Sequence, residues 1–511
     1  MKHARRPARS WIVVAALTCA VWLYALARAA EPAASQATAD LEWPMWGRSP
    51  ARNLVAPRAT PPTSWDVETG ASIKWTAELG GAAYGNPVLA DGRLFVGTNN
   101  EHPRDAALDG DRGVMMCFRA ADGEFLWQDV YDKLAAGDSQ DWQLIGIGSS
   151  PAVAGERVYY VSNRGQVVCA DVEGFADGEN DGPTKDESRS GPHDADIVWR
   201  FDMLAEVGVL PRYLATSNPL VVNGRLFVVT SNGVDPDSNE LRTPDAPSFL
   251  ALDAATGKLL WQEGSVSGPQ HKVHLATIFE GQWGSPCWID AVGDRAAQVC
   301  FPGGDGWLYA LDPASGALVW KFDCNPPDSV WKPGGRGDRN YILSTPVAVD
   351  GTVYVATGVD PQHGSGPGQL VAVDAAGQRE ATTTVARWRV GGKEFGRSIS
   401  SVAVHEGVVY AAELAGFLHA LDAKTGQELW QQDTLAEVWG STLVAAGRVY
   451  LGDADGKLTV VKAGRELEVL AENQFNESIY GTPIAVGRTL YVATQSKLIA
   501  IEDGASSPAG R

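Results

Sequence analysis

The sequence lacks the short motifs that identify the commonest enzyme classes. It contains no His-Glu-x-x-His zinc motif, no Gly-x-Ser-x-Gly nucleophile elbow and no Walker phosphate loop. Cysteine is scarce: there are 6 in 511 residues, no two are adjacent, and no Cys-x-x-Cys-His motif for covalent haem occurs. Metalloprotease, esterase-type and P-loop chemistry are therefore without support.

Positive charge is also in short supply. The chain has 42 Lys and Arg against 62 Asp and Glu, a formal net charge of −20. A phosphate backbone attracts basic surfaces, so this balance argues against a nucleic-acid partner.

Long apolar runs are confined to the N-terminus. A basic segment (1–10) precedes an apolar run (11–27), and Ala27 and Ala29 offer the small residues of a signal-peptidase site. We expect residues 1–29 to be a signal peptide, the alternative being a retained anchor helix. No later stretch is apolar enough to cross a bilayer. We therefore expect an exported protein, periplasmic or extracellular, with no membrane span after cleavage.

What the sequence does have is an internal repeat. Segments such as "TPIAV" recur with a Gly-containing turn, a β-rich run and a third strand of the type "FLHALD". One equivalent residue at the start of each unit, called its mark, shows that there are eight units. The marks are Pro87, Pro151, Pro219, Pro286, Pro346, Ser401, Thr442 and Pro483. The last units are about 41 residues long, the period of a β-propeller blade.

The repeat predicts an all-β fold, an eight-bladed β-propeller of four-stranded antiparallel blades. The last unit lacks a fourth strand, and an unattached copy of the fourth-strand segment stands at 66–75. We therefore expect the N-terminal strand to complete the last blade and close the ring, which removes exposed edges. A pair of β-sandwiches or an open solenoid would not need these end pieces. The predicted domains are an arm (30–64), the propeller (65–504) and a disordered tail (505–511).

Before each fourth strand stands a box such as "LDAKTGQELW" (421–430). Its Asp and Thr-Gly residues suit a turn, and its Trp suits packing between blades. Copies on every side of a ring cannot converge on one ligand, so the box is interpreted as structural. The Trp residues in this slot are Trp75, Trp127, Trp199, Trp261, Trp320, Trp388 and Trp430. The seventh blade departs, with Leu470 near the slot.

This repeat resembles the PQQ-like repeat of quinoprotein dehydrogenase-type propellers and of BamB-like exported bacterial proteins. The resemblance covers about residues 65–504 and includes "WPMWGRSPARN" (43–53), "FPGGDGWLYALD" (301–312) and "WKFDCNP" (320–326). It implies two functions: a binding or assembly scaffold for a protein or small ligand, without catalysis, or a PQQ-dependent oxidoreductase with a degenerate site.

The residues favour the scaffold. Enzymes of this family use adjacent cysteines above the quinone, a Ca²⁺ ion held by carboxylate and amide groups, and a catalytic Asp. No adjacent cysteines occur here, and no Asp can be matched to the catalytic one. PQQ and Ca²⁺ thus remain cofactors that the resemblance alone suggests.

The channel mouth is the predicted binding site. First strands of a propeller line the central channel, so the residues just before each mark should meet there as a funnel for a ligand or peptide. The residues predicted to form this funnel are Tyr84, Trp283, Trp439, Tyr480, Arg339, Arg397 and Glu437. The alternative is that these aromatic residues only pack blade against blade.

Two further features are weaker. Asp177, Glu179 and Asp181 are spaced like the start of a calcium loop, although Ser188 stands where an EF-hand requires Glu, and a solvated acidic loop is the alternative. Cys287 and Cys300 flank a hairpin turn symmetrically and could form a cross-strand disulfide in an exported protein.

Overall fold

The computed structural model describes residues 42–135, 140–235, 238, 240–263, 283–332, 336–376 and 384–506. The predicted signal peptide, residues 30–41 of the predicted arm and residues 507–511 of the predicted tail lie outside the described residues. Within these ranges no helix has the length and apolar character needed to span a membrane.

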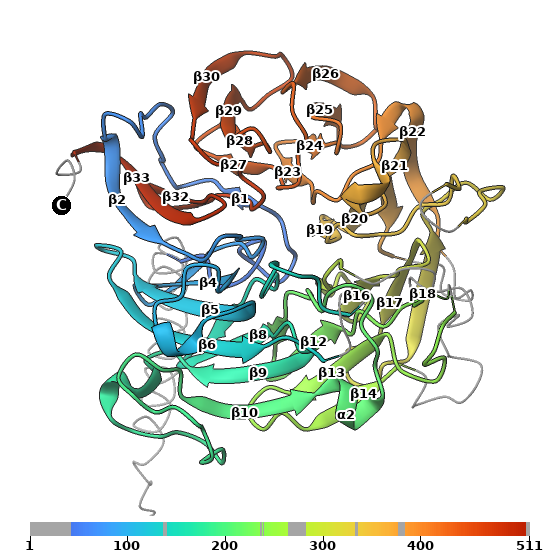
Figure 1. Cartoon of the computed structure of the whole chain (residues 1–511). Coiled ribbons are helices and arrows are strands. Elements are labelled where there is room, and N and C mark those ends of the chain that lie inside the picture. The colour runs from blue at the N-terminus through green and yellow to red at the C-terminus, as the bar shows by residue number, and fades with distance from the viewer. Residues whose placement is uncertain are drawn as a thin grey trace, which may run out of the picture.

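Eight four-stranded sheets surround a central axis, in chain order around the ring (Figure 1). Neighbouring strands within each blade are antiparallel, and the shortest strand lies innermost. The first four blades comprise β3 (Val88–Ala90), β4 (Arg93–Asn99), β5 (Arg112–Arg119) and β6 (Phe125–Asp132); β7 (Ala152–Ala154), β8 (Arg157–Val161), β9 (Gln166–Asp171) and β10 (Ile197–Asp202); β11 (Leu220–Val222), β12 (Arg225–Val229), β13 (Phe249–Asp253) and β14 (Leu259–Gln262); and β15 (Cys287–Ile289), β16 (Gln298–Pro302), β17 (Trp307–Leu311) and β18 (Leu318–Asp323).

The second half of the ring repeats this plan, which confirms the predicted eight-bladed all-β propeller. Its blades comprise β19 (Val347–Val349), β20 (Thr352–Thr357), β21 (Pro367–Asp374) and β22 (Ala386–Gly396); β23 (Ala403–His405), β24 (Val408–Ala412), β25 (Phe417–Asp422) and β26 (Glu428–Asp433); β27 (Leu443–Ala445), β28 (Arg448–Gly452), β29 (Lys457–Lys462) and β30 (Val469–Gln474); and β31 (Ile484–Val486), β32 (Thr489–Ala493), β33 (Lys497–Ser506) and β2 (Ala71–Glu78). The short helical segments lie in connections: α2 (Met203–Val207), η1 (Ala106–Leu108), η2 (Gly174–Asp177) and η5 (Pro361–His363).

The predicted hairpin turns join the first and second strands. In the first blade Ala90 pairs with Arg93, so the turn consists of Asp91 and Gly92, with φ values of 46° and 68°. Two residues with positive φ give the turn that matches the twist of a hairpin, and Gly accepts this geometry without strain.

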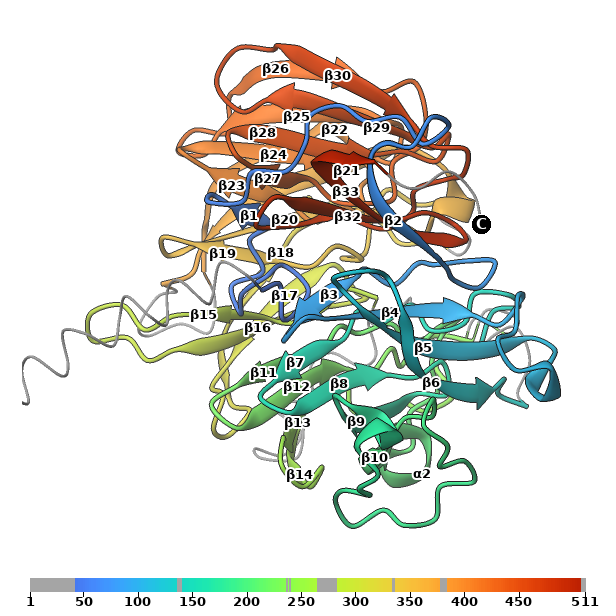
Figure 2. The ribbon, with the colours of Figure 1, turned by 90° about the vertical axis from the view of Figure 1, so that its left-hand side faces the viewer.

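The eighth blade contains strands from both ends of the chain. Strand β2 lies antiparallel to β33, with Trp75 opposite Ala500, and the two ribbons run side by side in Figures 1 and 2. In the sixth blade Trp430 of the fourth strand lies opposite Ala420 of the third strand in the same way. The N-terminal strand therefore occupies the fourth-strand position of the eighth blade.

Seven seams between blades share one contact. The indole Nε1 of each box Trp donates a hydrogen bond of 2.9–3.2 Å to a backbone carbonyl in the box of the next blade. The indole ring also packs against the Gly in the box of the next blade. A Cβ on Gly257 would lie 2.5 Å from the Trp199 ring, and one on Gly426 would lie 2.7 Å from the Trp388 ring. Gly at this place therefore permits the close approach of a flat indole.

The seventh blade has no such Trp. The residue opposite Val460, in the register that holds Trp elsewhere, is Ala471. Leu470 lies directly beside this position, as expected, and is 38% exposed. The arm fills this seam instead. Asn473 on β30 donates to the Thr63 carbonyl and accepts from the Trp65 N–H, and the Trp65 ring lies 5.9 Å from that of Phe475.

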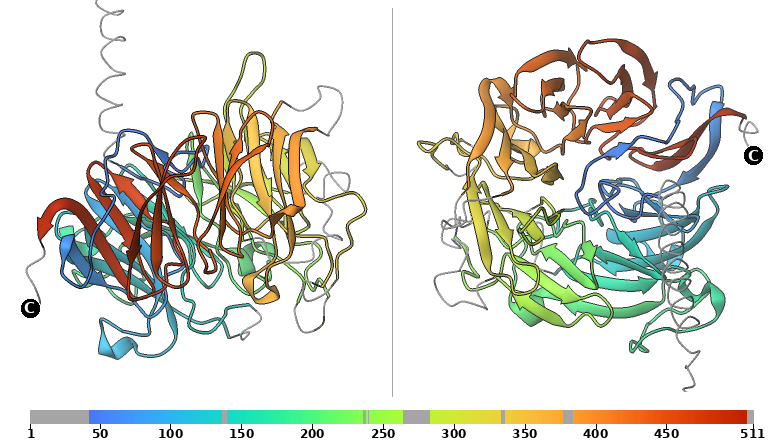
Figure 3. Two further views of the ribbon diagram at one scale, coloured as in Figure 1. Left: turned by 90° about the horizontal axis from the view of Figure 1, so that it is seen from above. Right: turned by 180° about the vertical axis from the view of Figure 1, so that it is seen from behind.

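Before it reaches this seam, the arm (residues 42–65) covers one end of the channel. It makes backbone or side-chain hydrogen bonds to the first-strand region or first turn of every blade, from Trp43 with Leu89 in the first to Thr60 with Gly487 in the eighth. One segment, β1 (Val55–Ala56), runs parallel to β27. The N-terminal ribbon lies toward the middle of the ring in both face views (Figures 1 and 3).

Arg52 anchors the arm. It is 0% exposed, and its guanidinium donates to the carbonyls of Trp46, Asn218, Pro219 and Pro286 at 2.8–3.0 Å. Burial lowers the pKa of Arg52 to about 9, which still leaves it protonated at neutral pH. A charged group this deep is tolerated because its donors are matched to backbone carbonyls.

Candidate functional site

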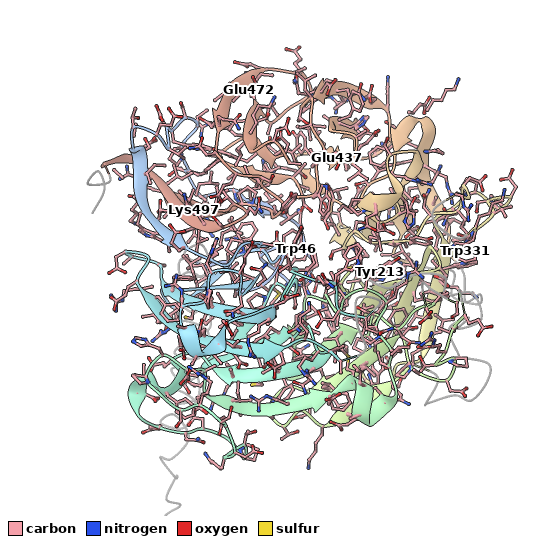
Figure 4. All side chains as sticks on the ribbon, in the orientation of Figure 1. Trp46, Tyr213, Trp331, Glu437, Glu472 and Lys497 are labelled. Carbon is pink, nitrogen blue, oxygen red and sulfur yellow. The ribbon has the colours of Figure 1, made fainter. Side chains whose placement is uncertain are left out.

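A cavity of about 440 Å³ lies on the channel, with Trp46 of the arm in its wall. This volume is in the usual range for small-molecule sites. Figure 4 shows Trp46 and Tyr213 toward the centre of the ring, whereas Glu472 lies at its periphery. Because the arm is bonded to every blade at its end of the channel, it bounds the cavity on that side.

Two aromatic clusters contribute to the cavity wall from opposite arcs of the ring. The connections into the seventh, eighth and first blades supply Trp439, Tyr480 and Tyr84, whose ring centroids are 5.0–5.8 Å apart. The second to fourth blades supply Trp142 and Trp283, 6.1 Å apart, and Trp142 stacks on Tyr213 at 4.7 Å. Four predicted funnel residues, Tyr84, Trp283, Trp439 and Tyr480, therefore line the cavity together.

The other three predicted funnel residues do not line it. Arg339 is held by Asp323, with bonds of 3.0 and 3.2 Å, and by the Asp305 carbonyl. The Arg397 guanidinium likewise binds to neighbouring loops. It donates hydrogen bonds to Asn340 Oδ1 and to the carbonyls of Gly337, His363 and Gly364. Glu437 accepts from the Trp439 indole at 3.3 Å. These arginines hold loops in place and do not face a ligand.

The part of the cavity wall that the described residues form is uncharged. Among the described residues that line it there is no Asp, Glu, Lys, Arg or His. Burial, together with the neighbouring Tyr480, raises the pKa of Tyr84 to about 12, so this phenol stays protonated at neutral pH. The described cavity wall thus contains predicted aromatic residues but none of the predicted charged ones, and the mixed charge of the wider funnel stays a prediction.

Beneath the aromatic residues runs a closed circle of eight hydrogen bonds. In each blade one residue donates its backbone N–H to the side-chain oxygen of the equivalent residue in the next blade, at 2.6–3.3 Å. The members are Asn86, Ser150, Asn218, Ser285, Thr345, Ser401, Ser441 and Thr482. The last bond, from Thr482 to Asn86, joins the eighth blade to the first in the same way as the others.

This circle was visible in the sequence but was not predicted. Asn, Ser or Thr directly precedes every Pro mark, and each can accept a hydrogen bond through its side chain. The sixth mark is one residue early, because Ser401 is itself a member of the circle and the residue equivalent to Pro346 is Val402.

The acidic loop does not gather into a metal site. Asp177 accepts a hydrogen bond from the Glu179 N–H, and Asp181 forms an ion pair with Arg157 at 2.9 Å. No group of three or more His, Cys, Asp or Glu side chains in the described ranges is arranged to hold a metal ion. The calcium-loop hypothesis for Asp177, Glu179 and Asp181 is therefore not supported.

The predicted disulfide is also absent from the structure. Cys287 and Cys300 lie directly opposite one another on β15 and β16, yet both are free, buried thiols. Burial raises the pKa of Cys300 well above its ordinary value, and this suppresses the thiolate through which disulfides form.

The fold and the site define an eight-bladed propeller with one end of its channel closed by an arm and an uncharged aromatic pocket on its axis. Comparison with known proteins shows what the chain is similar to. Residues 304–507 match the family model described as outer membrane protein assembly factor BamB. The chain is similar both to proteins named BamB and to quinoprotein alcohol dehydrogenases.

Three relatives illustrate this double similarity. The outer membrane protein assembly factor BamB of Burkholderia pseudomallei is 26% identical over 307 residues, 60% of this chain and 65% of the relative. The 1-butanol dehydrogenase (cytochrome c) of Thauera butanivorans is 30% identical over 152 residues, 28% of this chain and 19% of the relative. Less than two thirds of either relative is therefore matched. A europium-containing methanol dehydrogenase superposes with a TM-score of 0.56 at 14% identity, covering 89% of each chain, which shows the shared fold.

The described cavity does not fit the cofactor that the quinoprotein resemblance implies. PQQ carries carboxylate groups, and its Ca²⁺ ion needs oxygen ligands that include carboxylates. The described wall offers neither cationic side chains for the first nor carboxylates for the second.

Proposed function

We propose that the protein is an exported, non-catalytic propeller that acts as a binding or assembly scaffold at the cell envelope. The observation that carries this proposal is the pocket at the channel axis, whose described wall contains no Asp, Glu, His, Lys, Arg or Cys side chain. General acid–base chemistry needs such groups within reach of the substrate. The similarity to proteins named as outer membrane assembly factors supports the scaffold role and the envelope location.

A pull-down from the envelope fraction tests the scaffold. The wild-type protein should retain a partner or ligand that the double variant Trp283→Ala with Trp439→Ala loses, because both rings line the pocket. A matched control is Trp288→Ala, which changes a half-buried indole next to Pro50 on the arm. Equal retention by all three proteins would contradict a binding role for the funnel.

The second candidate is a quinone-dependent oxidoreductase, favoured by the 30% identity to a 1-butanol dehydrogenase over 152 residues. Incubation of the purified protein with PQQ and Ca²⁺ separates the two candidates. A quinone absorbance that stays with the protein and reduces a dye in the presence of an alcohol would establish the enzyme. Absence of bound PQQ would contradict the oxidoreductase candidate.

A further inference from the structure

Four hydroxyl groups of the circle line the cavity and carry a proton for which no described residue is an acceptor. Thr345, Ser401, Ser441 and Thr482 each accept a backbone N–H through the side-chain oxygen, and none of them donates to a described residue. All four side chains line the cavity and are at most 5% exposed. A hydroxyl can accept and donate at once, so these groups retain one donor each.

Trp46 of the arm lies beside these hydroxyl groups in the cavity wall. It is 4% exposed, and its indole nitrogen is itself covered by protein, so the open donors of the pocket are the hydroxyl groups. A ligand that presents acceptor oxygens to these hydroxyl groups would gain hydrogen bonds. The hydroxyl donors belong to four consecutive blades, the fifth to the eighth, so they form an arc on one side of the channel.

The aromatic walls and the absence of charge narrow the ligand further. Trp439 and Tyr480 stand on one side of the pocket, and Trp142 and Trp283 on the other. All four are half-buried, so part of each ring remains uncovered by protein. Phosphate and carboxylate groups are bound most strongly by cationic partners, and the described wall offers none. These observations favour an uncharged occupant with apolar faces and several acceptor oxygens.

We propose that this pocket binds a neutral saccharide; the proposal rests on the scaffold function and specifies its ligand. A pyranose ring presents C–H faces to aromatic rings and an oxygen on nearly every carbon to the hydroxyl donors. A flat hydrocarbon or simple aromatic ligand would leave most of the donors unused. Because the arm closes one end of the channel, the sugar enters from the other end with its terminal residue first.

The experiment uses the purified full chain. Cellobiose, maltose, chitobiose and an array of longer neutral glycans serve as probes, with binding followed by tryptophan fluorescence and calorimetry. At least one neutral glycan should bind, with an affinity that does not change with salt because no ion pair forms. Trp439→Ala should weaken binding about tenfold, while Trp288→Ala leaves it unchanged.

A second pair of variants isolates the donors. Thr345→Val removes the hydroxyl, and with it both the free proton and the oxygen that accepts the Ser285 N–H, and it should weaken binding. Thr345→Ser keeps both roles and should bind as the wild type does. Melting temperatures verify that each variant is folded. Binding of a proline-rich peptide or of charged glycans only, or of no neutral glycan at all, overturns the proposal. If the envelope pull-down still depends on Trp283 and Trp439, the scaffold function stands while the saccharide assignment falls.

Discussion

Seven seams of this ring are closed by a tryptophan of the repeat, and the eighth, between the seventh and eighth blades, is closed by the N-terminal arm. At the sixth-to-seventh seam Trp430 donates to Gly464 of the next blade. At the seventh-to-eighth seam the register position holds Ala471, and Tyr450 donates instead to the carbonyls of Pro61 and Pro62. The small residue leaves room for the chain to pass from the channel to the outer strand.

This difference explains why the repeat is broken where it is. A Trp at position 471 would occupy the space through which the arm reaches β2, so arm and indole are alternative fillings of one seam. The seven Trp seams depend on contacts within the repeat, whereas the eighth depends on a segment more than 380 residues away in the sequence. Stability of that seam should therefore respond to changes in the arm.

The largest expected effect comes from the anchor of the arm. Arg52→Met leaves four buried backbone carbonyls without their donor, and we expect the free energy of unfolding to fall by about 5 kcal/mol. Urea denaturation measures this loss. Arg58→Met, in the exposed part of the same arm, should change it by less than about 1 kcal/mol. Equal effects of the two changes would mean that the arm is not anchored at Arg52.

A swap between the two kinds of seam gives the next largest effect. Trp65→Ala should cost about 4 kcal/mol through the cavity that it leaves. Ala471→Trp should cost about 2 kcal/mol through overpacking against the arm. In the double variant the new indole fills the space left by Trp65, so the combined cost should be at least about 2 kcal/mol below the sum. Purely additive costs, measured by urea denaturation, would refute the shared space, and Trp430→Ala combined with Trp65→Ala provides the additive control.

The architecture could be predicted from the sequence because each blade of a propeller repeats the same short sequence features. Marks, turns and box tryptophans recur in each unit, and the predicted blades agree with the sheets from β3 to β33. The path of the arm could not be predicted, since Arg52 meets partners 166 to 234 residues away that carry no repeat signature. The absent Trp of the seventh blade was a visible sign of something unusual at that seam.

The site was predicted less completely, for a different physical reason. Aromatic residues before the marks point into the channel because the first strand fixes their backbone. Arg339 and Arg397 have long side chains that can reach either the channel or nearby carbonyls, and position in the repeat does not decide between these outcomes. Satisfying a buried guanidinium needs several acceptors, and the loops supply them.

The smallest expected effect is a dependence of stability on pH at the third-to-fourth seam that the arm seam does not share. Asp305 is 1% exposed and accepts a hydrogen bond from Tyr309, whose ring lies 5.7 Å from Phe249 across the third-to-fourth seam. Burial raises the pKa of Asp305 to about 6, above its value of 3.8 in a model peptide. Because the folded state binds this proton more tightly, the stabilisation is complete below about pH 4 and is lost as the pH rises through about 6, at most about 3 kcal/mol.

Asp305→Asn mimics the protonated side chain at every pH, so it should match the wild type below about pH 4 and be more stable above about pH 6. The arm seam should not follow this change. Its bonds join Asn473 to Thr63 and Trp65, and Tyr450, which donates to Pro61 and Pro62, stays protonated because burial raises its pKa above the ordinary value of 10.0. Amide hydrogen exchange, corrected for the intrinsic pH dependence, should show the variant protecting β16 and β17 at neutral pH while residues 60–65 exchange as in the wild type. A variant whose stability advantage is the same at pH 4 and pH 7 would show that Asp305 does not titrate at this seam.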